Sequence, residues 1–240
     1  MGTPRPWTVL RHDPIVELEA NLWCVEADLP FSAVRRRMSI VRRADGGLLF
    51  HNAVPLSEEA MRRIEAFGRP ALLVVPNGLH RLDIHAFTAR YPRLRVHCPV
   101  QAHRRVSARV PVDGHWSDLP PDPDVRAEPL EGSRFGEAAL VVRSGARASL
   151  LFGDTVMNLP HLPGLEGRLL RFLGSTGRPR VTPVARLLAV SDRRRLAAHL
   201  ARLADVPGLR RLVVSHGRNV EQDAAGALRA VARDLHTSAG

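Results

Sequence analysis

Three apolar segments of this 240-residue chain run into a polar residue whose side chain can bind a metal. The three residues are His80, Asp154 and His216. In layered α/β proteins the ends of strands often carry functional groups, because the strand fixes the position and the following loop leaves the side chain free. Two imidazoles and one carboxylate form a mixed nitrogen and oxygen ligand set that suits zinc, iron or manganese. If the three strand ends converge, the sequence predicts one divalent metal ion bound by these residues.

Each of these residues also has a purely structural interpretation. His80 could cap the next helix or lie in a polar core, and Asp154 could form an Asx turn within Gly-Asp-Thr. Weaker candidates for the same site are Asn77, Arg81, Asp83, His85, His51, Asn52 and Ser133. Asp83 could instead be the N-cap of a helix that begins at Ile84, and His85 could lie on the surface of that helix. Arg81 could contact an anionic substrate or simply face solvent.

Short apolar runs predict the strands that position these residues. The predicted strands are Met38–Arg42, Leu48–Val54, Ala71–Pro76, Leu94–Val100, Ala138–Arg143, Ser149–Gly153 and Leu212–Ser215. The third and the last are apolar enough to be buried on both faces. Gly46-Gly47, preceded by Asp45, indicates a hairpin between the first two strands.

Helical spacing of apolar residues, together with cap residues, predicts the helices. They are Ser57–Phe67, with Ser57 as N-cap, then Ile84–Arg90, Ser191–Ala204 and Glu221–Leu235. Breaker residues indicate loops at 118–124 and 174–179. A hairpin followed by strands that alternate with helices predicts an α/β layered fold. The length suits one domain over residues 1–240.

Composition narrows the classes of protein further. No apolar run approaches the ~20 residues of a membrane helix. The first residues do not resemble a secretory signal, so we expect a cytoplasmic protein. Cys24 and Cys98 are too few for a disulfide framework, and two buried thiols are the expectation.

The formal net charge of +11 would usually suggest a nucleic acid partner. However, every basic residue is arginine, the arginines are scattered, and aromatic residues are only 5% of the chain. Stacking platforms for single strands are therefore scarce, which argues against nucleic acid binding.

The strand ends, in this order, resemble the metallo-β-lactamase superfamily over nearly the whole chain. The segments 37–41, 47–56 and 75–80 resemble an uncharacterised branch with an Arg-Met start and a Pro-Asn-x-x-His strand end. The resemblance implies a four-layer αββα sandwich. It also implies a metal site, with Asp154 at the position of the bridging aspartate and His216 at that of the last histidine.

The metal-binding motif of the superfamily is eroded in this chain. The superfamily carries Thr-His-x-His-x-Asp-His after the strand that ends near Val75. Here Pro76 stands for the threonine and Asn77 for the first histidine. Leu79, Arg81 and Leu82 stand for the second histidine, the aspartate and the last histidine.

A further ligand is lost in the segment that resembles Gly-His-Thr-x-Gly, where Ser133 replaces the histidine. A dinuclear centre is therefore not expected. His80, Asp154 and His216 would still supply three ligands and leave an open position for water. No general acid is evident.

The candidate ligands and the eroded motif lead to two alternative functions. The first is a hydrolase with one metal ion, zinc, iron or manganese, that acts on a small molecule. The second is a non-catalytic member that binds no metal and uses the old cleft for binding or assembly; the absence of a metal is an equal alternative. An iron-dependent oxidoreductase would need more of the superfamily's ligands. We also expect His161–Val184 to pack over the cleft and shape access to it.

Overall fold

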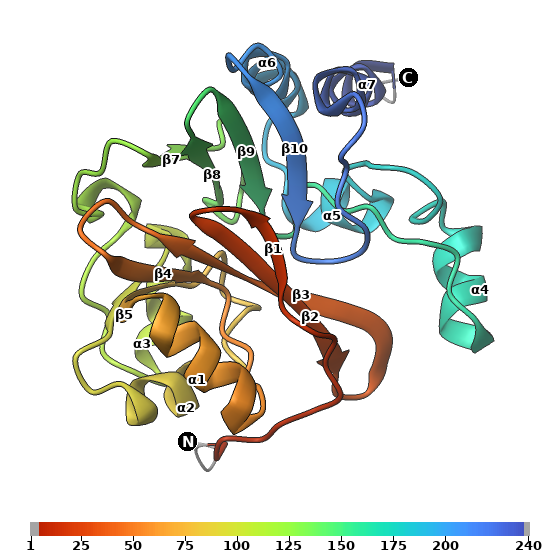
Figure 1. The fold of residues 1–240 in the computed structure, drawn as a ribbon. Helices are drawn as coiled ribbons and strands as arrows, with labels where there is room; N and C mark the ends of the chain where they lie inside the picture. Colours follow the sequence, from red (N-terminus) through yellow and green to blue (C-terminus); the bar gives the residue numbers. More distant parts are fainter. Residues whose placement is uncertain (1–4, 238–240) are drawn as a thin grey trace.

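Two β-sheets form the centre of the protein, and the computed structural model describes residues 5–237. One sheet has six strands in the order β1-β2-β3-β4-β5-β6, and the other has four in the order β10-β9-β8-β7 (Figure 1). The first contains β1 Val16–Glu19, β2 Leu22–Leu29, β3 Ser32–Arg42, β4 Gly47–His51, β5 Arg69–Val74 and β6 Arg95–His97. The second contains β7 Val125–Pro129, β8 Ala138–Ser144, β9 Arg147–Phe152 and β10 Leu209–Val214.

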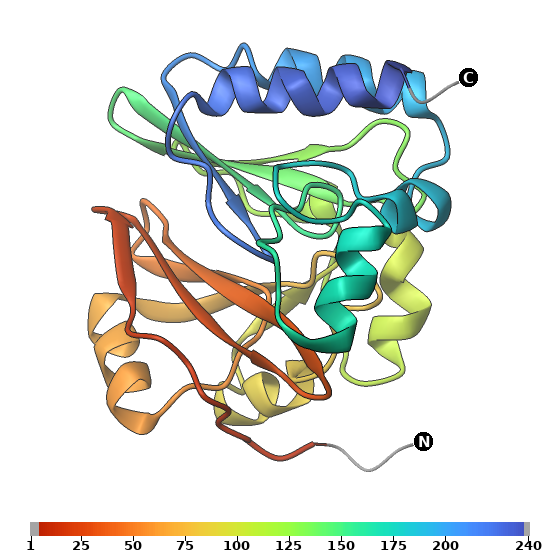
Figure 2. The ribbon, with the colours of Figure 1, turned by 90° about the vertical axis from the view of Figure 1, so that its right-hand side faces the viewer.

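Helices cover the outer face of each sheet, as both views show (Figures 1 and 2). The six-stranded sheet carries α1 Glu58–Phe67, α2 Ile84–Arg90 and α3 His103–Ser107. The four-stranded sheet carries α6 Arg193–Leu203 and α7 Ala224–Thr237, with α5 Pro183–Leu188 packed against the same core. The helix α4 Gly164–Phe172 contacts β3 of the six-stranded sheet. Between the sheets, side chains such as Leu72 and Leu151 form a shared apolar core. The predicted αββα sandwich is confirmed.

The hairpin predicted at Gly46-Gly47 joins β3 to the antiparallel β4. Gly46 lies at φ 74°, a conformation that glycine adopts readily. The predicted strand Leu48–Val54 is too long. Asn52, at φ 72°, turns the chain out of the sheet directly after His51, and its backbone N–H donates to the carbonyl of Val74.

The first half of β3 and all of β2 were not predicted, because their charged residues hide the strand pattern. Arg35 donates to Asp13 and Asp28, and Arg37 donates to Glu26 on β2. These pairs across the hairpin satisfy charges that, in the sequence alone, resemble a solvated loop.

The helix starts confirm the caps and correct two boundaries. Ser57 Oγ accepts from the N–H of Ala60. Asp192 rather than Ser191 caps α6, accepting from Arg195 N–H at 3.0 Å. The last helix begins at Ala224, not Glu221, because Asp223 sits at φ 44° and accepts from the N–H of Gly226.

Two further expectations concern cysteines and membranes. Cys24 and Cys98 are buried free thiols, as expected. Within residues 5–237, no helix combines the length and the apolar character that crossing a membrane requires.

Candidate metal centre

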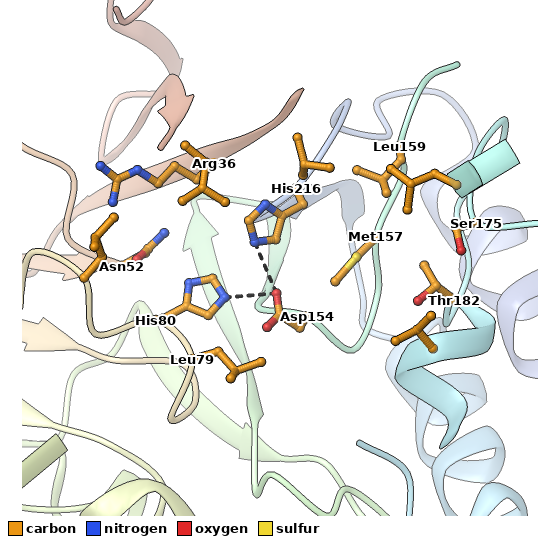
Figure 3. Close-up of a pocket in the computed structure, with 15 residues that line it drawn as sticks. Arg36, Asn52, Leu79, His80, Asp154, Met157, Leu159, Ser175, Thr182 and His216 are labelled. Carbon is orange, nitrogen blue, oxygen red and sulfur yellow. Dashed lines mark hydrogen bonds and ion pairs between the residues drawn. The ribbon is translucent and has the colours of Figure 1, made fainter. Parts of the chain in front are cut away.

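His80, Asp154 and His216 converge at one point between the two sheets (Figure 3). His80 follows β5, Asp154 follows β9 and His216 follows β10. Asp154 Oδ1 lies 2.9 Å from His80 Nε2 and 3.3 Å from His216 Nε2. Three segments that are far apart in sequence therefore bring two imidazoles and one carboxylate to a common centre.

The His216 ring is held so that its Nε2 faces Asp154. Its Nδ1 lies 2.8 Å from the carbonyl oxygen of Arg35, which can only accept, so Nδ1 carries a proton. Nε2, which faces Asp154, is then the ring nitrogen that a metal ion would bind in place of that contact, and a carbonyl behind a histidine is a usual partner in metal sites. The next residue, Gly217, lies at φ 96°, and a Cβ there would meet the Asn158 carbonyl oxygen at 2.1 Å.

Asn77 and Glu137 hold the aspartate from behind. The Oδ1 atom of Asn77 accepts from the backbone N–H of Leu79 at 2.8 Å, so the amide nitrogen points the other way. That nitrogen donates to Asp154 Oδ2 at 2.9 Å and to Glu137 Oε1. Asn77 is therefore a hydrogen-bond donor to two carboxylates and cannot at the same time be a metal ligand.

The buried Glu137 carboxylate joins the loop before β8 to the end of β9. It accepts from the backbone N–H groups of Asp154 at 2.9 Å and Thr155 at 2.8 Å, and from Thr155 Oγ1 at 2.5 Å. Gly153 permits this approach, because a Cβ there would meet Glu137 Oε1 at 2.8 Å. The Gly-Asp-Thr turn is thus fixed by a carboxylate from another strand.

The charges at the centre favour an ionised aspartate. Burial alone would raise the pKa of Asp154, but the charges and hydrogen bonds of His80 and His216 hold it well below its usual value. Burial alone would lower the pKa of His80, but the Asp154 carboxylate raises it. Burial and the charge of Asp154 raise the pKa of Glu137. Asp154 and His80 therefore each favour the charged form of the other.

The three side chains fit a divalent ion by type and by spacing. Their ligand atoms lie within 4.8 Å of one another. A tetrahedral ion with bonds near 2.1 Å needs ligand atoms roughly 3.3–3.6 Å apart, so small side-chain shifts suffice. Three protein ligands leave one position open, which is the pattern of catalytic rather than structural zinc sites.

The weaker candidates are placed differently. His51 is buried behind His80, and burial, with His80 nearby, lowers its pKa to about 3. Asp83 is N-terminal to α2, but its carboxylate does not cap the helix and instead pairs with buried Arg36 at 2.6 Å. His85 lines a separate hollow beside Trp7 and does not line the cavity over His80, Asp154 and His216.

Two more candidates fall outside the centre. Ser133 forms an isolated bridge to Val190 and does not line the cavity at the site. Arg81 does not line that cavity either, although Leu79 and Leu82 on each side of it do. Asp83, His85, Ser133 and Arg81 therefore remain outside the described His80, Asp154 and His216 group.

A cavity of about 360 Å³ opens over the three side chains, and its walls are mainly apolar. Leu170, Ser175, Thr182 and Val184 form one wall, so the segment His161–Val184 lies over the cleft as expected. Across from it lie Arg36 of β3 and Asn52, which directly follows β4 (Figure 3).

Asn52, a weaker candidate from the sequence, lines the cavity, whereas Glu137 and Arg36 were missed as site residues. Glu137 and Arg36 are charged yet only 1% and 4% exposed, which sequence spacing does not reveal. The sequence signal for Asn52 is the polar pair His51-Asn52 at the end of an apolar strand. The positions of Glu137 and Arg36 depend instead on which strand ends meet in space.

By sequence, no family model and no curated protein matches the chain. Solved structures do match. The DIM-1 metallo-β-lactamase exposed to ceftazidime superposes with a TM-score of 0.62 at 12% identity, covering 95% of this chain and 98% of that chain. A metallo-β-lactamase from Erythrobacter litoralis, with β-mercaptoethanol in its active site, superposes with a TM-score of 0.62 at 12% identity, covering 92% of this chain and 96% of that chain. A metallo-β-lactamase from Pontibacter korlensis superposes with a TM-score of 0.62 at 11% identity, covering 93% of this chain and 100% of that chain. The chain therefore has the metallo-β-lactamase superfamily fold.

Proposed function

We propose that this protein is a hydrolase of small molecules with a single divalent metal ion at His80, Asp154 and His216. The observation that carries the proposal is the convergence of these three side chains, from three strand ends, on the floor of one cavity. A site for zinc, iron or manganese is consistent with two imidazoles and one carboxylate. The cytoplasmic location and the lack of a nucleic acid partner stay predictions from the sequence.

The chain's own residues would orient the site before substrate binds. The carbonyl of Arg35 holds His216, and Asn77 holds Asp154 through the oxygen that faces away from His80. A divalent ion bound here would supply Lewis-acid activation of water. The apolar walls would exclude bulk water, which strengthens the interaction between a substrate's polar group and Asp154, His80 and His216.

The position of Asn77 supports a site with one metal ion rather than two. The superfamily motif places a ligand here, but the Asn77 amide donates both protons to carboxylates. A second cation beside Asp154 Oδ2 would face these N–H groups, which repel it.

The experiment is elemental analysis of protein purified without chelator. We expect about one equivalent of metal per chain in the wild type, and its loss in Asp154→Ala and His216→Ala. His85→Ala is the matched control, since this histidine lies at a different hollow, and it should retain the metal. Hydrolysis of a chromogenic acyl ester should fall with metal content in the same variants. Metal retained in both site variants would refute the assignment.

A second candidate function is a binding module without metal. The observation that favours it is the closed hydrogen-bond network, in which Asp154 already bonds His80 and Asn77. This candidate predicts metal-free protein whose thermal stability is unchanged by chelator, whereas the hydrolase predicts a lower melting temperature after chelation.

A further inference from the structure

The most exposed large apolar side chains of the described residues gather around the mouth of the cavity. Phe31 is fully exposed at the tip of the β2–β3 hairpin, and Leu165 and Phe172 on α4 are 77% and 87% exposed. Leu187 on α5 is 70% exposed. We call the exposed residues of the hairpin tip, α4 and α5 the apolar rim. An apolar patch next to a cavity usually marks a surface that binds a partner.

The helix α4 shows the pattern most clearly. Leu165, Leu169 and Phe172 are spaced by four and three residues, so they lie on one face of the helix, and all three are exposed. Arg168 and Arg171 on the same helix are exposed as well. Arg168 and Arg171 lie along one edge of this apolar stripe, and a helix with an exposed apolar face beside arginines is typical of proteins that lie on a negatively charged membrane surface.

The one acidic residue of α4, Glu166, is bound to the hairpin tip by hydrogen bonds. Glu166 accepts from Ser32 Oγ and from the N–H of Ala33, both at 2.6 Å. These bonds attach α4 to the hairpin tip and place Phe31 beside it; Figure 2 shows the helix next to the ends of β2 and β3. The rim is therefore one continuous surface built from two distant segments.

Phe31 adds an observation about local conformation. It lies at φ 66°, which is costly for a bulky side chain and would be easier for asparagine or glycine. A fully exposed phenylalanine gains nothing from packing within the chain at this position. Contact with an apolar partner would account for it.

The rim continues into the cavity. Leu29 and Val34 of the hairpin, Leu170 of α4 and Val184 of α5 line the cavity, while their neighbours in sequence form the rim. An apolar chain held at the rim could thus enter the cavity without crossing water, and its polar end would reach His80 and Asp154 (Figure 3).

We propose that the apolar rim docks on an anionic lipid surface and that the cavity takes up the acyl chain of a lipid. The docking stands on the rim alone, whereas the use of the acyl chain as substrate rests on the proposed hydrolase function. The net charge of +11 and the arginines of α4 complement anionic headgroups. A second copy of the chain fits less well, because a symmetric contact would set the α4 arginines against each other and cover the mouth of the cavity.

The test is sedimentation with vesicles of phosphatidylcholine alone, or of phosphatidylcholine mixed with phosphatidylglycerol at a ratio of about 2:1. We expect binding to the mixed vesicles that weakens with salt and with the loss of phosphatidylglycerol. Leu165→Ser/Leu169→Ser/Phe172→Ser should bind at least about tenfold more weakly, since three apolar side chains no longer leave water. Phe31→Asn suits its backbone conformation and should weaken binding without loss of folding.

The matched control changes three valines that are exposed away from the rim. Val9→Ser/Val16→Ser/Val100→Ser removes a similar kind of side chain and should bind vesicles as the wild type does. Equal binding by the control and the α4 variant, or no binding to the mixed vesicles, overturns the proposal. So does a dimer in solution that the α4 variant dissociates, measured by light scattering. The vesicle assay on chelated protein separates the two proposals, because docking should persist when metal and hydrolysis are absent.

Discussion

At the scale of residues, Asn77 decides what kind of metal site this fold can hold here. It stands where the superfamily motif has a histidine, and it donates to Asp154 and Glu137 instead of binding a metal. The Asn77 amide therefore holds the buried carboxylates of Glu137 and Asp154 in one cluster, although the two residues are 17 positions apart in sequence. Removing its N–H groups would leave like charges facing each other in a low dielectric.

Asn77→Asp tests this role. The new carboxylate would face Glu137 and Asp154, and we expect the free energy of unfolding to fall by about 3 kcal/mol at neutral pH, a size usual for a buried unpaired charge. Urea denaturation measures it. The control is Asn158→Asp, because that side chain is only partly buried and its amide donates to the Arg218 carbonyl rather than to a carboxylate. An equal and small change in both variants would contradict the role given to Asn77.

A second prediction at the scale of residues concerns the loss of folding stability at acidic pH. His97 is buried, and burial lowers its pKa below the usual value, so the unfolded chain binds a proton there before the folded protein does. Stability should therefore fall as pH drops below the unfolded value near 6.5, by up to about 1.4 kcal/mol per pH unit for this group. The fall should continue until the lowered folded pKa is reached.

His97→Gln should flatten the dependence of unfolding free energy on pH between about 6.5 and 5. His85→Gln is the control, because His85 is only partly buried at a surface hollow. If the slope is the same in the wild type and in His97→Gln, the buried imidazole does not contribute to acid sensitivity.

At the scale of elements, the ends of β5, β9 and β10 create the centre, and each end depends on local backbone geometry. Strand ends carrying Asp154 and His216 could be predicted from apolar runs that stop at a polar residue. His80 was predicted at the same edge although it is out of register with the superfamily motif. Glu137 could not be predicted, because its position depends on how closely the loop before β8 approaches Gly153.

Gly217→Ala tests the geometry after β10. The new Cβ would collide with the Asn158 carbonyl oxygen at 2.1 Å, so the loop must shift and His216 must move with it. We expect a loss of about 1–3 kcal/mol in stability together with reduced metal content. Gly145→Ala is the matched control, since Gly145 also has a positive φ, 61°, but nothing lies within 4 Å of a Cβ there. A metal content that stays equal in both variants would show that His216 tolerates the shift.

At the scale of the whole molecule, the four layers could be predicted from the resemblance and from the order of strands and helices. The apolar interface between the sheets then follows from strands buried on both faces, such as β5 and β10. The hairpin β2–β3 and the helix α4 could not be predicted, because arginines and exposed leucines obscure the usual periodicity. These same elements form the rim at the mouth of the cavity.

The most direct test of the account is a crystal structure of protein purified without chelator, with anomalous diffraction recorded on both sides of the metal's absorption edge. The account predicts one anomalous peak per chain, within bonding distance of His80 Nε2, Asp154 Oδ1 and His216 Nε2. A peak elsewhere, two peaks beside Asp154, or His80 and His216 still hydrogen-bonded to Asp154 with no peak between them would contradict it.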